Sequence, residues 1–251
     1  MNTYLRDFEI PATYPVPITL RHLMTHTPGF EDRVVGLFAS GPRTVGDFHE
    51  NLIKMRPARV MMPGKVTSYS NYGSALAAHL VEIAAQQPWE DYLEQHILKP
   101  LAMNRTSARQ PLPLALAGDM ATGYWQVGGE EVPAGNEFVS IPPAASMSAT
   151  SADMAAFMLE LLASGDTAVM TAVARAKLFE QGFRSDPRMS GVLHGPYEMS
   201  SHGQRVVGHG GDTTAFHSAL RLYPRAEARP VRVVQFRTGS GIARHCDHRI
   251  R

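Results

Sequence analysis

Several features that would mark a particular class of protein are scarce or missing in this sequence. The 251 residues contain a single cysteine, Cys246, which excludes an internal disulfide. No apolar run reaches the roughly 20 residues that a membrane-spanning helix needs, so we expect no membrane segment. Residues 1–15 have no apolar core of the kind that a signal peptide contains. The sequence therefore leaves the compartment undetermined.

A strong net charge is missing as well. The formal charge of +1 at pH 7 gives no strong attraction to nucleic acid or to membrane surfaces, and we expect no nucleic-acid partner. The charge is nevertheless uneven, because residues 1–220 carry 16 basic and 21 acidic side chains. Residues 221–251 carry eight arginines, no lysine and two acidic side chains. The C-terminal part is therefore distinctly basic.

The hydrophobic pattern and the turn residues predict an α+β chain. Helices are expected at about residues 20–26, 45–54, 73–86, 89–97, 152–165 and 171–181. Residues 106–149 are rich in loop residues, with room for short strands. After about residue 192 the pattern changes to strands, at 192–199, 204–211, 215–224 and 231–236. Glycine-containing turns separate the first three, which favours an antiparallel meander.

Two histidines four residues apart, His22 and His26, raise the alternative of a zinc hydrolase. A zinc protease helix has the pattern His-Glu-x-x-His, in which the glutamate is the general base. Here Leu23 stands at the position of that glutamate, and no third ligand is evident nearby. We therefore expect no metal and no cofactor, and we interpret the two histidines as local capping or hydrogen-bonding groups.

The stretch ITLRHLMTHTPGF (residues 18–30) instead resembles the "ITxRHLLTHTSGL" signature of the serine β-lactamase-like superfamily. That family includes class C β-lactamases, D-Ala-D-Ala carboxypeptidases and esterases. Four further blocks resemble it in the family's order: MPGKVTSYSNYGSALAAHLVE, DYLEQHILKPLAMNRTS, PAASMSATSADMAAFM and VVGHGGDTTAFHSALRLYP. The resemblance implies a β-lactamase/transpeptidase-like fold, in which helices pack on an antiparallel sheet beside a helical region. It also implies hydrolysis of an amide, ester or β-lactam through an acyl-enzyme.

The first site residues implied by the resemblance lie in Tyr69-Ser70-Asn71, which matches the family's Tyr-x-Asn loop. Tyr69 would be the general base, and Asn71 would bind an amide of the substrate. A tyrosine serves as a base when nearby positive charge favours its phenolate. In this family that charge comes from the lysine of a Ser-x-x-Lys pair, whose serine is the nucleophile. The expected substrate is a small or peptide-like molecule.

The second set of implied site residues begins at His209-Gly210-Gly211. Many members of the family have Lys-Thr-Gly here, and many esterase-like members have His-x-Gly. His209 would lie beside the tyrosine and help to hold its charge, while Gly210 and Gly211 would let a substrate approach the strand edge. The backbone N–H of Asp212 would be one of two oxyanion donors. Histidine in place of lysine favours an esterase or peptidase over a β-lactamase.

The nucleophile itself is missing from this sequence, because no Ser-x-x-Lys occurs in the 251 residues. In the family this pair lies well before the first block, whereas only seventeen residues precede Ile18. We therefore expect residues 1–224 to be a β-lactamase-related hydrolase domain without its N-terminal part, and inactive. The alternative is a non-catalytic ligand-binding module that keeps the cleft. An in-frame Ser-x-x-Lys in the upstream DNA would favour the enzyme.

The family pattern holds as far as Pro224 and then fails. Residues 225–251 are rich in arginine and match no block of the family. Read in a shifted frame, the codons of residues 225–236 permit the turn and strand that the resemblance leads us to expect. We therefore hypothesise a single-base frameshift near residue 224. The alternative is a genuine basic tail with an anionic partner, and resequencing the gene decides between the two.

Overall fold

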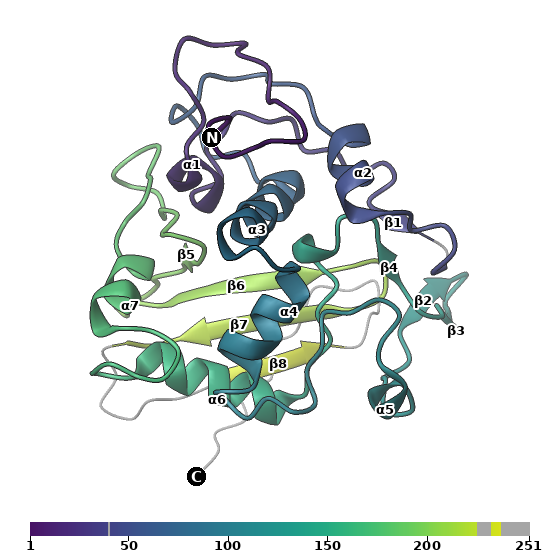
Figure 1. Ribbon diagram of the computed structural model, residues 1–251. Coiled ribbons are helices and arrows are strands. Elements are labelled where there is room, and N and C mark those ends of the chain that lie inside the picture. The colour runs from purple at the N-terminus through teal and green to yellow at the C-terminus, as the bar shows by residue number, and fades with distance from the viewer. Residues whose placement is uncertain (40, 225–231, 237–251) are drawn as a thin grey trace.

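Helices and an antiparallel sheet make up an α+β architecture, as the sequence predicts. The computed structural model describes residues 1–39, 41–224 and 232–236 (Figure 1). The helices are α1 (Leu20–Met24), α2 (Phe48–Lys54), α3 (Asn71–Ala85), α4 (Trp89–Leu93), the π-helix Glu94–Leu98, α5 (Leu114–Ala117), the 3₁₀-helix Pro142–Ala144, α6 (Ser151–Leu162) and α7 (Ala172–Leu178). No helix in this described part is long and apolar enough to span a membrane.

Side-chain caps determine where most of these helices begin. A hydroxyl or carboxylate oxygen accepts a backbone N–H of the first turn at Thr19, Asp47, Ser70, Thr150 and Thr171. Two predicted helix starts were wrong because a different residue caps the helix. The second helix starts at Phe48, not near residue 45, because Asp47 is its cap. The third starts at Asn71, not at residue 73, because Ser70 is its cap.

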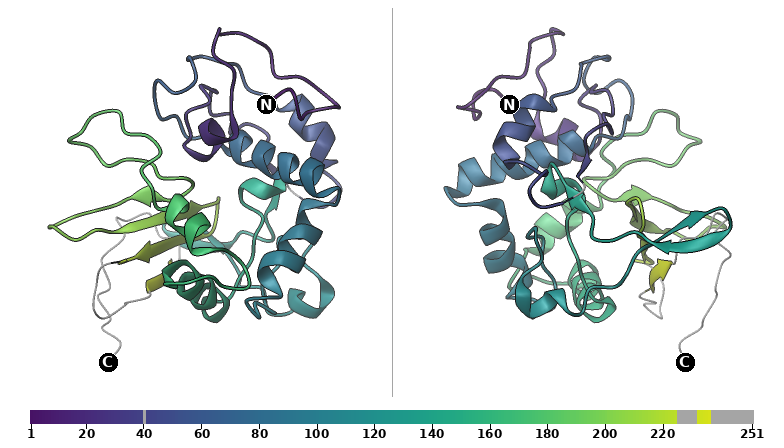
Figure 2. Two further views of the ribbon diagram at one scale, coloured as in Figure 1. Left: turned by 60° about the vertical axis from the view of Figure 1, so that its left-hand side comes forward. Right: turned by 90° about the vertical axis from the view of Figure 1, so that its right-hand side faces the viewer.

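The main sheet is a four-stranded antiparallel meander in the order β5-β6-β7-β8, which confirms the predicted topology. Its strands are β5 (Tyr197–Glu198), β6 (Val207–Asp212), β7 (His217–Leu222) and β8 (Arg232–Phe236). Two short ladders lie elsewhere: β1 (Phe38–Ala39) with β4 (Phe138–Val139), and β2 (Tyr124–Val127) with β3 (Glu130–Pro133). The β2–β3 hairpin projects from the side of the molecule (Figure 2).

One edge of β6 is largely open in the described part of the chain. Strand β5 pairs only with Val207 and Gly208, at the start of β6. On its other side, β6 pairs with β7 along its full length, from Val207 opposite Leu222 to Asp212 opposite His217. On the β5 side, residues 209–212 pair with no described strand, so this edge can be extended by another chain, although the Gly210 carbonyl already accepts the Nδ1–H of His209.

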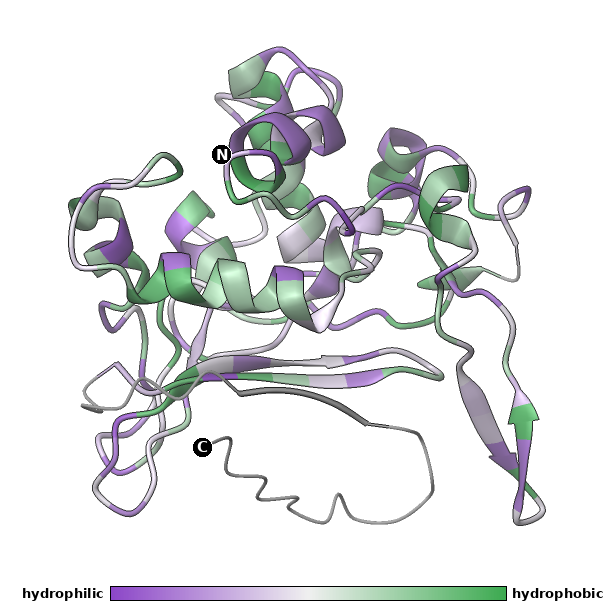
Figure 3. Cartoon of the chain, turned by 90° about the horizontal axis from the view of Figure 1, so that it is seen from below, coloured by the Kyte–Doolittle hydropathy of each residue, from purple (hydrophilic) through white to green (hydrophobic). Residues whose placement is uncertain are grey.

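The described helices lie on one side of the main sheet (Figure 3), and two hydrophobic clusters are buried in this part of the chain. The larger cluster surrounds α3, where Leu76 is fully buried together with Phe30 and Leu52. The smaller one packs Met158 of α6 against Val207 and Leu222 of the sheet. Each fully buried side chain of this size contributes about 1.5–3 kcal/mol. The main sheet and the helical region around α3 therefore lie on opposite sides of a shared space.

The hypothesis of a frameshift near residue 224 concerns residues that mostly lie outside the described part of the chain. Only β8 of this tail is described, and it pairs with β7 from Arg232 opposite Arg221 to Phe236 opposite His217. The sequence in its given reading frame also predicts a strand, at residues 231–236. The frameshift and the basic tail both remain predictions about residues 225–251.

Candidate active site

The two histidines of the first motif are scaffold residues. The Nδ1 atom of His22 accepts the backbone N–H of Thr19 at 3.2 Å and completes the capping box of α1. The Nδ1 atom of His26 accepts the backbone N–H of Ser70 at 3.2 Å. His26 is buried, with 5% of its surface exposed, and has a positive φ of 50°. It therefore fixes the loop that leads into α3.

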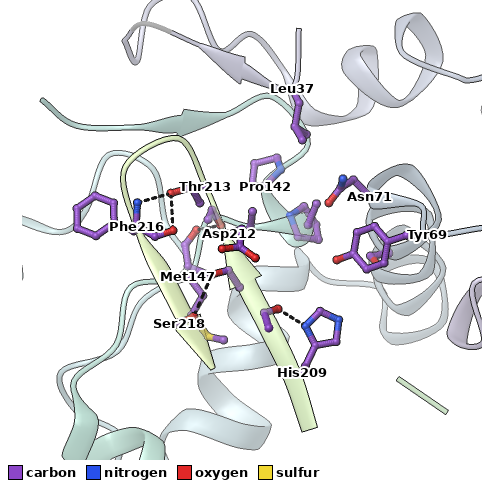
Figure 4. A pocket seen from close by; sticks show the side chains of 18 of the residues that line it. Leu37, Tyr69, Asn71, Pro142, Met147, His209, Asp212, Thr213, Phe216 and Ser218 are labelled. Carbon is purple, nitrogen blue, oxygen red and sulfur yellow. Dashed lines mark hydrogen bonds between the residues drawn. The ribbon is translucent and has the colours of Figure 1, made fainter. Parts of the chain in front are cut away.

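A cleft of about 890 Å³ lies between the start of α3, the open edge of β6 and residues 142–147 (Figure 4). All of the site residues implied by the sequence line it: Tyr69, Asn71, His209, Gly210, Gly211 and Asp212. Its volume is in the range of cavities that bind small molecules. The structure thus brings together two segments that are far apart in the sequence.

The α3 side of the cleft is built by the helix cap. Ser70 is buried, and its Oγ accepts the N–H of Gly73 at 3.0 Å while its own N–H is bound to His26. This fixed residue separates Tyr69 from Asn71, so both side chains are held at the helix start and face β6 (Figure 4). The side-chain amide of Asn71 makes no hydrogen bond to another described residue and is free to bind a ligand.

The opposite wall of the cleft is the open edge of β6. A Cβ atom at Gly211 would lie 2.5 Å from Oγ of Ser218 on β7, so a larger residue there would require the serine side chain to rotate. The ring of His209 is oriented by its Nδ1–H, which donates to the carbonyl oxygen of Gly210. A carbonyl can only accept, so Nδ1 carries a proton and Nε2 is the atom left to exchange one.

Four aromatic rings meet where the two walls come together. The ring of Tyr69 lies 4.4 Å from that of His26 and 6.0 Å from that of His209. The ring of Tyr197 lies 5.3 Å from that of His209 and stacks on His26 at 5.9 Å. Tyr197 was not predicted from the sequence. No feature of the sequence indicates that Tyr197 lies there, because its position beside the cleft depends on the pairing of β5 with Gly208.

The electrostatics of the cleft keep Tyr69 protonated at neutral pH. Burial raises the pKa of Tyr69, and the carboxylates of Asp32 and Asp212 raise it further. Burial raises the pKa of Tyr197 as well. No lysine or arginine is among the described residues that line the cleft. A phenolate at Tyr69 therefore requires positive charge from another source.

Acid is expected to destabilise the fold through His26. Burial, and next the charge of His209, lower the pKa of His26 to about 4 from its ordinary 6.5. The unfolded chain takes up this proton near pH 6.5 and the folded chain only near pH 4. The stability contributed by neutral His26 is complete above pH 6.5, and about 3 kcal/mol is lost as the pH falls through this window.

Urea unfolding of the wild type and of His26→Asn, at several values between pH 7 and pH 4, tests this expectation. Asparagine accepts the Ser70 N–H, tolerates a positive φ and does not titrate. The variant should lose less stability than the wild type over this range. An identical loss in the two proteins would show that His26 is not responsible.

Comparison of the sequence with known families and proteins gives a consistent result. A family model described as Beta-lactamase matches residues 2–247. A Bacillus subtilis (strain 168) protein named as a penicillin-binding protein, PbpX, is 27% identical over 210 residues, which cover 81% of this chain and 48% of that protein. The chain thus spans about half the length of this curated relative.

Solved structures with the same fold include a penicillin-binding protein and an amidase. The penicillin-binding protein from Bacillus halodurans superimposes with a TM-score of 0.66 and 18% identity, over 88% of this chain and 69% of that one. The D-amino acid amidase from Ochrobactrum anthropi SV3, complexed with L-phenylalanine amide, has a TM-score of 0.63 and 20% identity, over 80% of this chain and 58% of that one. At these identities the similarity establishes the fold.

Proposed function

The chain belongs to the beta-lactamase family, and we propose that it forms the tyrosine and histidine walls of a serine hydrolase cleft. The substrate is a small or peptide-like amide, ester or β-lactam, cleaved through an acyl-enzyme. The observation that carries the proposal is the convergence on one cleft of all six residues implied by the family motifs. These residues come from the start of α3 and from β6, which face each other across the cleft (Figure 4).

Substrate binding in this proposal uses the open edge of β6. An extended substrate pairs with the unpaired edge of β6 at residues 209–212, as peptides pair with exposed sheet edges. The side-chain amide of Asn71 binds an amide of the substrate from the opposite wall. The backbone N–H of Asp212 donates to the developing oxyanion, an interaction that strengthens as charge forms in the transition state.

In the proposed proton transfer, Tyr69 is the general base and His209 is the polar side chain beside it. The raised pKa of Tyr69 means that the tyrosine needs a cation beside it before it can accept a proton from the serine. We propose that this cation is the lysine of a Ser-x-x-Lys segment that lies outside the 251 residues. The same segment would supply the nucleophilic serine. The serine needs Tyr69 to accept its proton, and Tyr69 needs the lysine beside it in order to act as a base.

An inner cavity of about 480 Å³ offers a place for this segment. It adjoins the cleft, and Tyr69 and His209 line both spaces. Its other walls are largely apolar, with Leu23 of α1, Phe157 of α6 and Leu220 of β7 among them. An amphipathic helix seated there would bury its apolar face and present its serine and lysine to Tyr69.

The residue at position 209 narrows the choice of substrate. Histidine replaces the lysine of the Lys-Thr-Gly motif, so strand β6 offers no permanent positive charge for a β-lactam carboxylate at this position. We therefore favour an ester or a small amide over a β-lactam. The second candidate function, a ligand-binding module without catalysis, is favoured by the protonated state of Tyr69 and by the absence of Ser-x-x-Lys from this sequence.

The test begins by sequencing the reading frame upstream of residue 1, and the chain extended by that frame is then used if it contains Ser-x-x-Lys. Hydrolysis of a p-nitrophenyl ester, a D-amino acid amide and a chromogenic β-lactam is measured, with the serine-to-alanine variant as control. Turnover of the ester or the amide that the control lacks supports the enzyme. Saturable binding of these compounds without turnover, or an upstream frame without Ser-x-x-Lys, supports the binding module.

A further inference from the structure

A cluster of metal-ligating side chains lies outside the cleft, where α2 packs beside α3 (Figure 1). His49 is on α2, and His79 and Glu82 lie three residues apart on α3. One ligand atom from each of the three residues falls within 4.8 Å of the others. In the described part of the chain this is the only group of three such residues. His22 and His26 do not belong to it.

The geometry of the cluster centres on one carboxylate oxygen. Oε2 of Glu82 lies 2.8 Å from Nε2 of His49 and 3.0 Å from Nδ1 of His79. Ligands of a tetrahedral zinc ion, with bonds of roughly 2.0–2.2 Å, are about 3.3–3.6 Å apart, somewhat further than these two contacts. Small side-chain rotations would therefore let the three atoms surround one ion.

The atoms that would not bind the ion are already held by other groups. Nε2 of His79 lies 3.2 Å from a carboxylate oxygen of Asp7, and Oε1 of Glu82 accepts the backbone N–H of Trp89 at 3.1 Å. A metal-binding histidine commonly donates its second N–H to a carboxylate in this way, which orients the ring and increases its basicity. In this arrangement Nδ1 of His79 faces Oε2 of Glu82, and the same oxygen contacts Nε2 of His49.

Burial gives the cluster a closed side and an open side. The side chain of His79 is 7% exposed and that of Glu82 is 10% exposed, whereas that of His49 is 48% exposed. The rings of Phe8 and Phe48 lie 6.1 and 6.4 Å from that of His79. An ion would enter past His49 and would be shielded from water on the α3 side.

We propose that His49, His79 and Glu82 bind one divalent cation, and that Zn²⁺ is the preferred ion. Two imidazole nitrogens and one carboxylate oxygen favour zinc over Mg²⁺ or Ca²⁺, which select all-oxygen sites. The role of the ion is structural. It clamps α2 to α3 and, through the contact of His79 with Asp7, also fixes the N-terminal segment.

Isothermal titration of the metal-free 251-residue chain with ZnCl₂, together with thermal unfolding, tests the site. The variants are His49→Ala, whose side chain is half exposed, and Glu82→Gln, which preserves shape. His96→Ala removes an exposed histidine outside the cluster and is the matched control. We expect one Zn²⁺ per chain and a Tm that rises with ZnCl₂ but not with MgCl₂. Both cluster variants should bind zinc about tenfold more weakly or worse, and His96→Ala should match the wild type.

The opposite results would overturn the proposal. Absence of zinc binding by the wild type, or equal affinity in the wild type, His49→Ala and Glu82→Gln, means that these side chains form a hydrogen-bonded network only. A rise in Tm of the same size in all four proteins would place the zinc on other histidines. None of these readouts depends on hydrolytic activity, so the result is independent of the proposed function.

Discussion

Tyr69→Phe, introduced into the chain extended with Ser-x-x-Lys, is expected to lower kcat for ester hydrolysis by about 100-fold or more, the usual effect of losing a general base. KM should change little, because only the hydroxyl is removed. The phenylalanine ring can keep the 4.4 Å contact with His26, so the loop before α3 is expected to stay in place. Steady-state kinetics with a p-nitrophenyl ester give both constants.

The matched control for this prediction is Tyr72→Phe. Tyr72 lies three residues further along the chain, in the first turn of α3, and its buried hydroxyl has no hydrogen-bond partner among the described residues. Removing that hydroxyl should leave kcat unchanged. If Tyr69→Phe turned over substrate as fast as Tyr72→Phe, Tyr69 would not be the base.

The 251-residue chain by itself is expected to hydrolyse neither chromogenic β-lactams nor p-nitrophenyl esters above background. The serines that line the cleft are not activated, because Ser74, Ser146 and Ser218 each donate a hydrogen bond to a backbone carbonyl. No described lysine lies beside them in the cleft. Turnover by this chain that is lost when one of these serines becomes alanine would contradict the expectation.

Much of the cleft could be predicted from the sequence because its residues lie in short, ordered motifs. Tyr69 and Asn71 flank a helix cap, and residues 209–212 lie on one strand, so local structure alone positions each pair. The family resemblance then supplied the one long-range fact, that the two segments face each other. The structure places them in one cleft, and the chemical roles assigned to them remain predictions.

The missed features depend on packing between distant segments. Tyr197 reaches the cleft through a two-residue strand that no periodicity signals. The sequence raises the alternative of a zinc site only at His22 and His26, which are close together in the chain. The cluster that the fold builds joins His49 to Glu82 across 33 residues, and no spacing rule connects them. The π-helix Glu94–Leu98 likewise continues a segment whose hydrophobic pattern predicts an ordinary helix.

Intact-protein mass spectrometry of the extended chain, quenched during hydrolysis of an activated ester, tests directly whether the cleft works through an acyl-enzyme. We expect a covalent acyl adduct on the serine of Ser-x-x-Lys. The adduct should be absent when that serine is alanine and absent from the 251-residue chain. An extended chain that hydrolyses the ester through an adduct on any other residue, or that forms no adduct and shows no turnover, would contradict the assignment of this cleft to acyl-enzyme chemistry.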